Sequence, residues 1–101
     1  MKRLIKNPHV GSILKYEFLD EINISQNALA KAIGVAANRI HAIINNTRRV
    51  TADTDLRLCK FFRLSEGYFL RLQNAYETAE AKRNLGNKLD RIQPYHGEHS
   101  L

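Results

Sequence analysis

Hydrophobic positions between residues 25 and 45 predict two short helices separated by a glycine. Apolar residues recur at i, i+1 and i+4 before the break and at i, i+3 and i+4 after it, and each spacing marks one face of a helix. These residues are Leu29, Ala30, Ile33, Ile40, Ile43 and Ile44. Ser25 is a favourable N-cap for the first helix, and Gly34 accommodates the positive φ that a tight turn requires. The pattern is typical of a helix-turn-helix, whose second helix enters the major groove of DNA, although an αα-hairpin inside another bundle shares the spacing.

The segments on either side of this pair also follow helical spacing. We expect a first helix from residue 11 to residue 19 or 20, a connector over 21–24, and a helix over 52–62 that Thr51 caps. The apolar face expected for this last helix consists of Leu56, Cys59 and Phe62, and Leu58 and Phe61 widen it.

The C-terminal third predicts further helix. A helix over 66–76 begins after Ser65, which is a suitable cap, and a more polar helical stretch over 78–85 and 88–92 is broken at Gly86. With little β-type alternation anywhere in the chain, the sequence predicts an all-α domain.

Composition shifts divide the 101 residues into three parts. Residues 1–10 form a basic arm, residues 11–93 form the helix-turn-helix domain with its C-terminal helices, and residues 94–101 form a flexible tail. The cations of the arm are Lys2, Arg3 and Lys6. The arm is either solvated or lies along phosphates.

The formal net charge of +6 is unevenly distributed. No Asp or Glu occurs from Ile22 to Ala52, and this acid-free window coincides with the predicted helix-turn-helix. The cations inside it are Lys31, Arg39, Arg48 and Arg49. A charge run alone often marks only a solvated surface, but the coincidence of the two signals favours a polyanionic partner, double-stranded DNA.

Side chains on the exposed face of the second helix are the candidates for reading bases. Asn38 matches the paired donor and acceptor of adenine, Ala37 suits a thymine methyl, and His41 or Arg39 reaches a guanine or a phosphate. For Arg39 a surface salt bridge is the alternative. The full candidate set is Gln26, Ala37, Asn38, Arg39, His41, Asn45, Arg48 and Arg49, with Gln26 and the two loop arginines assigned to the phosphate backbone.

Other classes of function find little support in the sequence. Cys59 is the only cysteine and lies in an apolar helical pattern, which favours a core residue and a cytoplasmic protein. No apolar run approaches the roughly 18 residues that span a bilayer, so we expect no membrane partner. Histidines are scattered, and His96 with His99 in the tail is a weak pair, so no metal and no cofactor is expected. No nucleophile–base set or phosphate loop indicates an enzyme.

Several short motifs, spread over residues 8 to 95, together resemble the HigA family of antitoxins. They are the run 25–35, Asn38-Arg39-Ile40, Thr51-Ala52-Asp53-Thr54, Leu56-Arg57-Leu58, Tyr68-Phe69-Leu70-Arg71-Leu72-Gln73, Ala75-Tyr76 and Leu89-Asp90-Arg91-Ile92-Gln93-Pro94. The pairing of early and late motifs is much more specific than a helix-turn-helix alone. The resemblance implies a five- to six-helix domain of the Xre/lambda-repressor-like helix-turn-helix class. Asn46 and Arg63 stand where glycine is usual in that family.

The resemblance also implies partners. It implies a homodimeric antitoxin that binds a palindromic operator, represses its own operon and neutralises a HigB-type, RelE-like toxin that cleaves mRNA. A stand-alone repressor of phage or plasmid type, without a toxin, is the alternative with the same DNA chemistry. A protein-interaction module that has lost DNA binding is a third, different class.

The dimer interface implied by the resemblance lies on the helix after residue 66. The matching positions are Phe69, Leu72, Gln73 and Tyr76. Phe69, Leu72 and Tyr76 form the most apolar stripe that remains once the helix-turn-helix core is filled. The alternative is that the stripe packs on the first helix, against Phe18 and Leu19, and both can hold if one edge of the stripe faces inward and the other lies across the two-fold axis.

Overall fold

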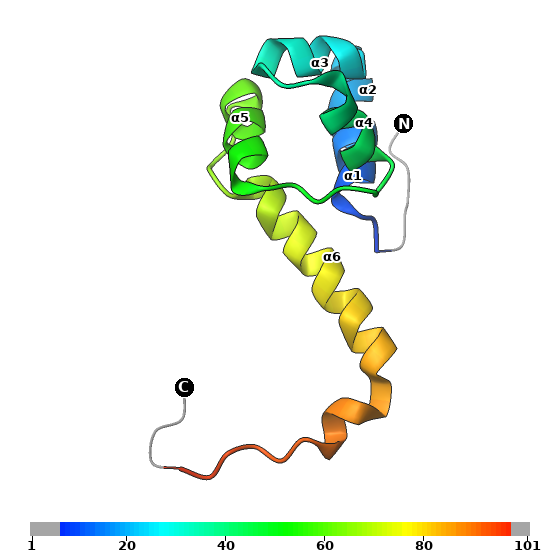
Figure 1. The fold of residues 1–101 in the computed structure, drawn as a ribbon, viewed down its shortest axis with the longest axis vertical. Coiled ribbons are helices and arrows are strands. Elements are labelled where there is room, and N and C mark those ends of the chain that lie inside the picture. Colours follow the sequence, from blue (N-terminus) through cyan, green and yellow to red (C-terminus); the bar gives the residue numbers. More distant parts are fainter. Residues whose placement is uncertain (1–6, 98–101) are drawn as a thin grey trace.

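The computed structural model describes residues 7–97, and all regular structure in that part of the chain is helical. A continuous first helix consists of α1 (Val10–Ile13), a π-helical segment η1 (Leu14–Leu19) and α2 (Asp20–Ile22). It is followed by α3 (Gln26–Ile33), α4 (Ala37–Ile44), α5 (Ala52–Phe62), α6 (Tyr68–Leu85) and a 3-10 segment η2 (Gly86–Arg91). The helices up to α5 form a compact body, and α6 runs out of it (Figure 1). The predicted all-α class is confirmed.

The first helix begins earlier and ends later than expected. Val10 is helical and buried, and the side chain of His9 caps the helix by accepting a hydrogen bond from the Gly11 amide at 3.1 Å. The predicted arm therefore includes at least one core residue, while residues 1–6, with Lys2, Arg3 and Lys6, lie outside the described part of the chain. The helix continues to Ile22 and ends at Asn23 in the left-handed region, so the first half of the predicted connector is helix.

Side chains from every long helix meet in one hydrophobic core. Its largest fully buried members are Leu14, Leu29, Ile40, Ile43, Leu58 and Phe69. Cys59 is buried as predicted, and burial raises the pKa of its thiol, which favours the unreactive protonated form. Phe18 packs against Phe69 and Phe62, with ring centroids 5.4 and 4.8 Å apart.

The buried face of α5 differs from the predicted one. Leu58 and Cys59 are buried as expected, but Leu56 is 48% exposed, and Thr54 and Asp55 are buried instead. The cause is the carboxylate of Asp55, which faces inward to accept backbone hydrogen bonds from the start of α6. A buried carboxylate needs such partners, and the pattern of apolar residues alone does not reveal them.

Helix α6 also differs from the sequence prediction at both ends. It begins at Tyr68 after Gly67, whose φ is +90°, and Ser65 makes no cap. Asp55 replaces that cap by accepting from the amides of Gly67 and Phe69 at 2.7 and 2.9 Å. The helix then runs unbroken past Tyr76 to Leu85. The two predicted helices are therefore one.

A buried glutamine fixes the angle at which α6 leaves the body. The side chain of Gln73 donates to the carbonyl of Val50 at 2.9 Å and accepts from the Val50 amide at 2.7 Å. Both residues are buried, so this pair of hydrogen bonds replaces solvent for an otherwise unpaired stretch of backbone. The loop between α4 and α5 is thereby tied to α6.

Candidate DNA-binding surface

Helices α3 and α4 form the predicted helix-turn-helix. The hydroxyl of Ser25 accepts from the Ala28 amide at 3.0 Å, which confirms the expected N-cap. Gly34 ends α3 with a φ of +75°, and the amide of Val35 returns to the carbonyl of Ala30 at 3.0 Å. The sequence and the structure therefore agree on where α3 begins and where it ends.

The recognition helix α4 has one face in the core and one in solvent. Ile40 and Ile43 are fully buried, and Asn38 and Asn45 are exposed. The backbone of α4 also lies close to the first helix, because a Cβ on Gly11 would come within 2.1 Å of the Ile43 carbonyl oxygen. Gly11 therefore permits the close approach that positions α4. The sequence predicts Gly11 only as a helix start, because its close contact with α4 involves residues more than 30 positions away.

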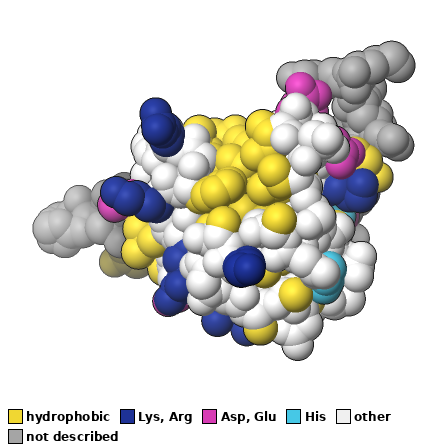
Figure 2. Space-filling model, turned by 90° about the horizontal axis from the view of Figure 1, so that it is seen from above, with side chains coloured by type: hydrophobic (Ala, Val, Ile, Leu, Met, Phe, Trp, Pro, Cys, Tyr) yellow, Lys and Arg dark blue, Asp and Glu magenta, His cyan; other side chains and the backbone are white. Residues whose placement is uncertain are grey.

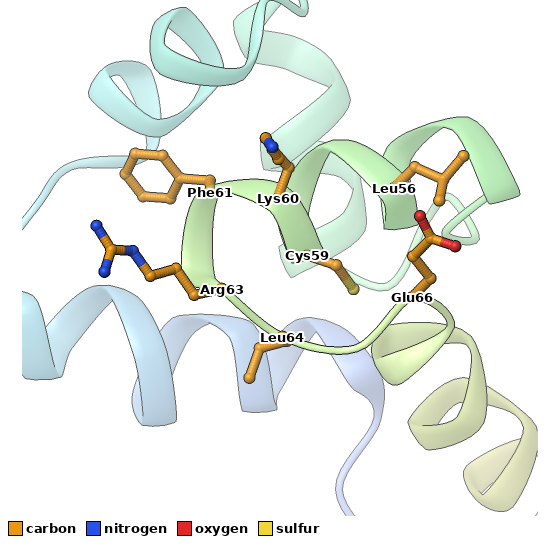
Figure 3. Close-up of a pocket in the computed structure, with 7 residues that line it drawn as sticks. All are labelled: Leu56, Cys59, Lys60, Phe61, Arg63, Leu64 and Glu66. Carbon is orange, nitrogen blue, oxygen red and sulfur yellow. The ribbon is translucent and has the colours of Figure 1, made fainter.

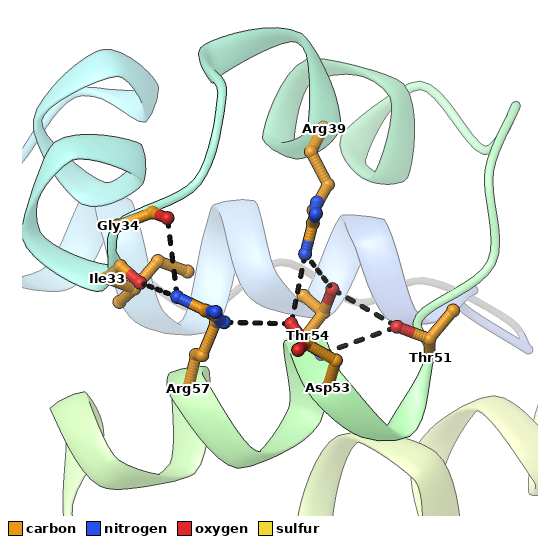
Figure 4. Close-up of polar contacts among 7 residues, drawn as sticks. All are labelled: Ile33, Gly34, Arg39, Thr51, Asp53, Thr54 and Arg57. Atoms are coloured by element: carbon orange, nitrogen blue, oxygen red, sulfur yellow. Dashed lines mark hydrogen bonds and ion pairs between the residues drawn. The ribbon is translucent and has the colours of Figure 1, made fainter.

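The side chain of Arg39 is held by two residues of α5, at the edge of the exposed face of α4. Its guanidinium lies 3.1 Å from the carboxylate of Asp53 and 3.2 Å from the hydroxyl of Thr54 (Figure 4). The salt bridge considered as the alternative for Arg39 is thus present. A base contact by Arg39 requires this pair to open.

Arg57 fastens the turn of the helix-turn-helix to α5. Its Nη1 donates to the carbonyls of Ile33 and Gly34 at 2.8 and 3.3 Å, and its Nε donates to Asp53 at 2.8 Å (Figure 4). The hydrogen bond from Arg57, followed by the weaker influence of Arg39, holds the pKa of Asp53 below its usual value. Arg57 was absent from the predicted site, because the two carbonyls it binds in the turn lie 23 and 24 residues away and leave no local signal.

His41 and Gln26 come together on the exposed side of the two helices. Nδ1 of His41 lies 2.5 Å from Oε1 of Gln26, and Nε2 lies 3.0 Å from Oδ1 of Asn27. Two of the predicted DNA-contacting residues are therefore partners of each other. Asn27 is an additional member of the surface that the sequence analysis did not include.

The loop after α4 presents its two arginines differently. Asn46 adopts the left-handed conformation, with a φ of +63°, as its glycine-like position suggested. Arg49 forms two hydrogen bonds with Glu77 of α6, at 2.7 and 2.9 Å, and these hold the pKa of Glu77 below its usual value. Arg48 is exposed and forms no ion pair with any residue between 7 and 97. Arg48 is therefore the loop cation that is free to meet a phosphate.

The residues expected at a dimer interface are engaged within the chain. Phe69 is fully buried against the first helix and Gln73 is buried against Val50, so neither side chain is free to face a second copy. Leu72 packs on the core, and the ring of Tyr76 lies 6.1 Å from that of His9. The alternative, in which this stripe packs on the first helix, describes Phe69 correctly.

A further hollow lies beside α5, away from the helix-turn-helix. A cavity of about 640 Å³ beside α5 is lined mainly by apolar and scattered charged side chains (Figure 3). In the described range 7–97, no three His, Cys, Asp or Glu residues are grouped as metal ligands would be. No helix in that range is both long enough and apolar enough to cross a bilayer.

Comparison with known proteins identifies relatives with this architecture. The helix-turn-helix family HTH_3 matches residues 15–69. An addiction module antidote protein of the HigA family from Coxiella burnetii is 39% identical, with a TM-score of 0.82 over 90% of this chain and all of that chain. The antitoxin HigA of Pseudomonas aeruginosa, solved with the higBA promoter, is 35% identical, with a TM-score of 0.81 over 90% of this chain and all of that one.

A further relative is known from its sequence. Virulence-associated protein I of Dichelobacter nodosus is 40% identical over 75% of this chain and 70% of its own length. The matches extend beyond the helix-turn-helix into the region of α6, where the late motifs of the sequence lie. The chain belongs to the HigA family of helix-turn-helix proteins.

Proposed function

We propose that this chain is an antitoxin that binds a palindromic operator as a homodimer, represses its own operon and neutralises a HigB-type mRNA-cleaving toxin. It acts in the cytoplasm as a binding protein and catalyses no reaction. The family supports this function, and the solved relatives include one determined with the higBA promoter.

The observation that carries the DNA-binding part is the surface of α4. Asn38 and Asn45 are exposed on it while the isoleucines opposite are buried, and no acidic residue occurs from Ile22 to Ala52. A helix with exposed amide side chains, in a stretch of sequence without acidic residues, suits the negatively charged major groove. Asn38 is assigned to a base, and Arg48 to a phosphate.

Asn38→Ala tests the base contact. We expect a loss of about 1–3 kcal/mol on DNA from upstream of the chain's own gene and a much smaller loss on random duplex. Arg48→Ala is the matched comparison, because loss of a phosphate contact weakens both DNAs alike and reduces the salt slope by about one. Fluorescence anisotropy over a salt series measures both. Equal losses on both DNAs for Asn38→Ala would contradict the placement of α4 in the groove.

A toxin partner separates this proposal from a stand-alone repressor. We expect a small toxin gene beside the gene for this chain, and expression of that toxin to arrest growth unless this chain is co-expressed. Growth arrest that co-expression does not relieve would favour the repressor without a toxin. A chain that binds neither DNA at low salt would favour the third class, a protein-interaction module.

A further inference from the structure

His41 joins the recognition helix to the start of α3 through both of its ring nitrogens. Oε1 of Gln26 lies 2.5 Å from Nδ1, and Oδ1 of Asn27 lies 3.0 Å from Nε2. Both partner atoms are amide oxygens, which accept hydrogen bonds and do not donate them. Neutral imidazole has one N–H, whereas imidazolium has two. Only the protonated ring satisfies both oxygens at once.

Loss of the proton changes what the neighbouring amides present to solvent. A neutral ring has one bare nitrogen, which needs a donor, so one carboxamide must turn round and offer its NH₂ group to the ring. The oxygen of that carboxamide then faces outward in place of the NH₂ group. Next to a phosphate, an outward NH₂ donates a hydrogen bond, whereas an outward oxygen is repelled.

We propose that His41 is a proton-dependent positioning residue for operator binding: its imidazolium holds the amides of Gln26 and Asn27 with their NH₂ groups toward the phosphate backbone. This inference rests on the proposed function, because it concerns the same DNA-binding surface. It also changes the role expected for His41, which positions other residues and does not itself read a base.

The charges around the ring permit this behaviour. The hollow that His41 shares with Gln26 and Asn27 is also lined by Lys15 and Asp20 of the first helix, and α3 contributes no charged residue to it. Lys15 and Asp20 lie 3.6 Å apart and offset each other's charge. Arg39, the neighbouring cation on α4, is paired with Asp53. A proton on His41 therefore adds a positive charge on the side that faces DNA.

Proton binding and operator binding must then reinforce each other, because each stabilises the state that the other prefers. We expect wild-type affinity for the operator to be roughly three- to tenfold higher at about pH 5.8 than at about pH 7.8, across the range in which histidine side chains ordinarily change charge. Fluorescence anisotropy at constant ionic strength measures this ratio. Circular dichroism at both pH values checks that the fold is unchanged.

His41→Gln is the test variant, because glutamine forms similar hydrogen bonds but does not titrate. Its affinity should differ less than twofold between the two pH values, by the same reasoning. His96→Gln is the matched control, because His96 is exposed and distant in sequence from the surface, and it should keep the wild-type ratio. Full pH dependence in His41→Gln, or none in the wild type, would overturn the inference.

A double variant separates positioning from direct contact. Gln26→Ala with Asn27→Ala removes both amides and leaves His41 in place, so the pH dependence should disappear. Its persistence would mean that His41 meets the phosphate itself, and the inference would be wrong.

Calorimetry in two buffers of different ionisation enthalpy supplies an independent readout. At about pH 7 we expect net proton uptake on operator binding in the wild type and a reduced uptake in His41→Gln. Equal uptake by the two proteins would overturn the inference. Absence of specific binding at either pH would overturn the proposed function itself, and the inference with it.

Discussion

Arg63 occupies a backbone conformation that arginine disfavours. It ends α5 with a φ of +61°, in the left-handed region that glycine enters without strain. Its side chain is exposed and forms no salt bridge with a residue between 7 and 97. The position therefore retains the backbone geometry of a glycine while carrying a cation at the C-terminal end of the helix, where its charge is favourable.

Arg63→Gly should stabilise the protein by about 0.5–1 kcal/mol, because relief of backbone strain exceeds the added entropy of the unfolded chain. Asn46→Gly is the matched control at a φ of +63°, where asparagine already tolerates the conformation, and its effect should be smaller. Urea denaturation monitored by circular dichroism measures both. A destabilised Arg63→Gly would show that the arginine side chain contributes more than its backbone costs.

Local rules predicted single residues well where the partner lies within one turn. The caps at Ser25 and Thr51 and the turn at Gly34 depend on neighbours in sequence, and all three are present. The ion pairs of Arg39 and Arg49 were harder to anticipate, because their partners lie 14 and 28 residues away. Charge pattern alone indicated which cations lie near the site but not which are already neutralised.

At the scale of elements, Asp55 is the residue that connects α5 to α6. Its carboxylate accepts from the amides of Gly67, Phe69 and Leu70 at 2.7, 2.9 and 3.3 Å, and it is almost completely buried. These amides belong to the start of α6, where helical N–H groups have no partner within the helix. One side chain thus performs the work of a cap from a different helix.

Asp55→Ala should destabilise the protein by about 2–4 kcal/mol, since it leaves buried amides unsatisfied and opens a small void. Ser65→Ala tests the cap that the sequence predicted and should change stability by less than about 0.5 kcal/mol. Denaturant midpoints of the two variants provide the comparison. A larger loss for Ser65→Ala than for Asp55→Ala would reverse the assignment.

The elements themselves were largely predictable, and their boundaries were less so. Helical spacing located α3, α4 and α5, because Ser25 and Thr51 cap α3 and α5 and Gly34 marks the turn before α4. The division of α6 into two helices was wrong, because a polar stretch after Tyr76 lacks the periodicity of a packed face. The buried face of α5 was predicted correctly at Leu58 and Cys59 but not at Asp55, because a buried aspartate does not register as a core residue.

At the scale of the molecule, the outer side of α5 is the surface best suited to a second copy. Leu56 and Phe61 are 48% and 39% exposed and border an apolar hollow of about 420 Å³ shared with α3. Hydrophobic side chains gather on the end of the molecule where α3 and α5 lie, with Lys and Arg around them (Figure 2).

Phe61→Glu should therefore convert the dimer to a monomer at tens of micromolar, because it places a charge in the centre of that apolar contact. Leu89→Glu in η2 is the control, as an equally exposed leucine on a different surface, and it should remain dimeric. Size-exclusion chromatography with light scattering reports the mass of each. A dimeric Phe61→Glu, or a monomeric wild type, would exclude α5 as the interface.

Specific operator binding depends on the oligomeric state of the protein. One helix-turn-helix reads only a few base pairs, and two recognition helices reach successive major grooves when they lie about 34 Å apart. The late family motifs indicated α6 as the dimer interface. They could not show that Phe69 and Gln73 of α6 are buried in the core of their own chain.

The two halves of α6 have different local stabilities. Asp55 and Gln73 secure its first turns, whereas residues 81–91 are all exposed. Asn7 donates to Glu80 at 2.6 Å, just before that exposed stretch begins. Opening of those turns breaks few buried contacts, so it requires much less free energy than unfolding of the body. A protease could cleave after Lys82 or Arg83 in such an opened state while the recognition helix remains folded. Degradation of the chain can thus begin at the far end of α6 while its DNA-binding surface is still intact.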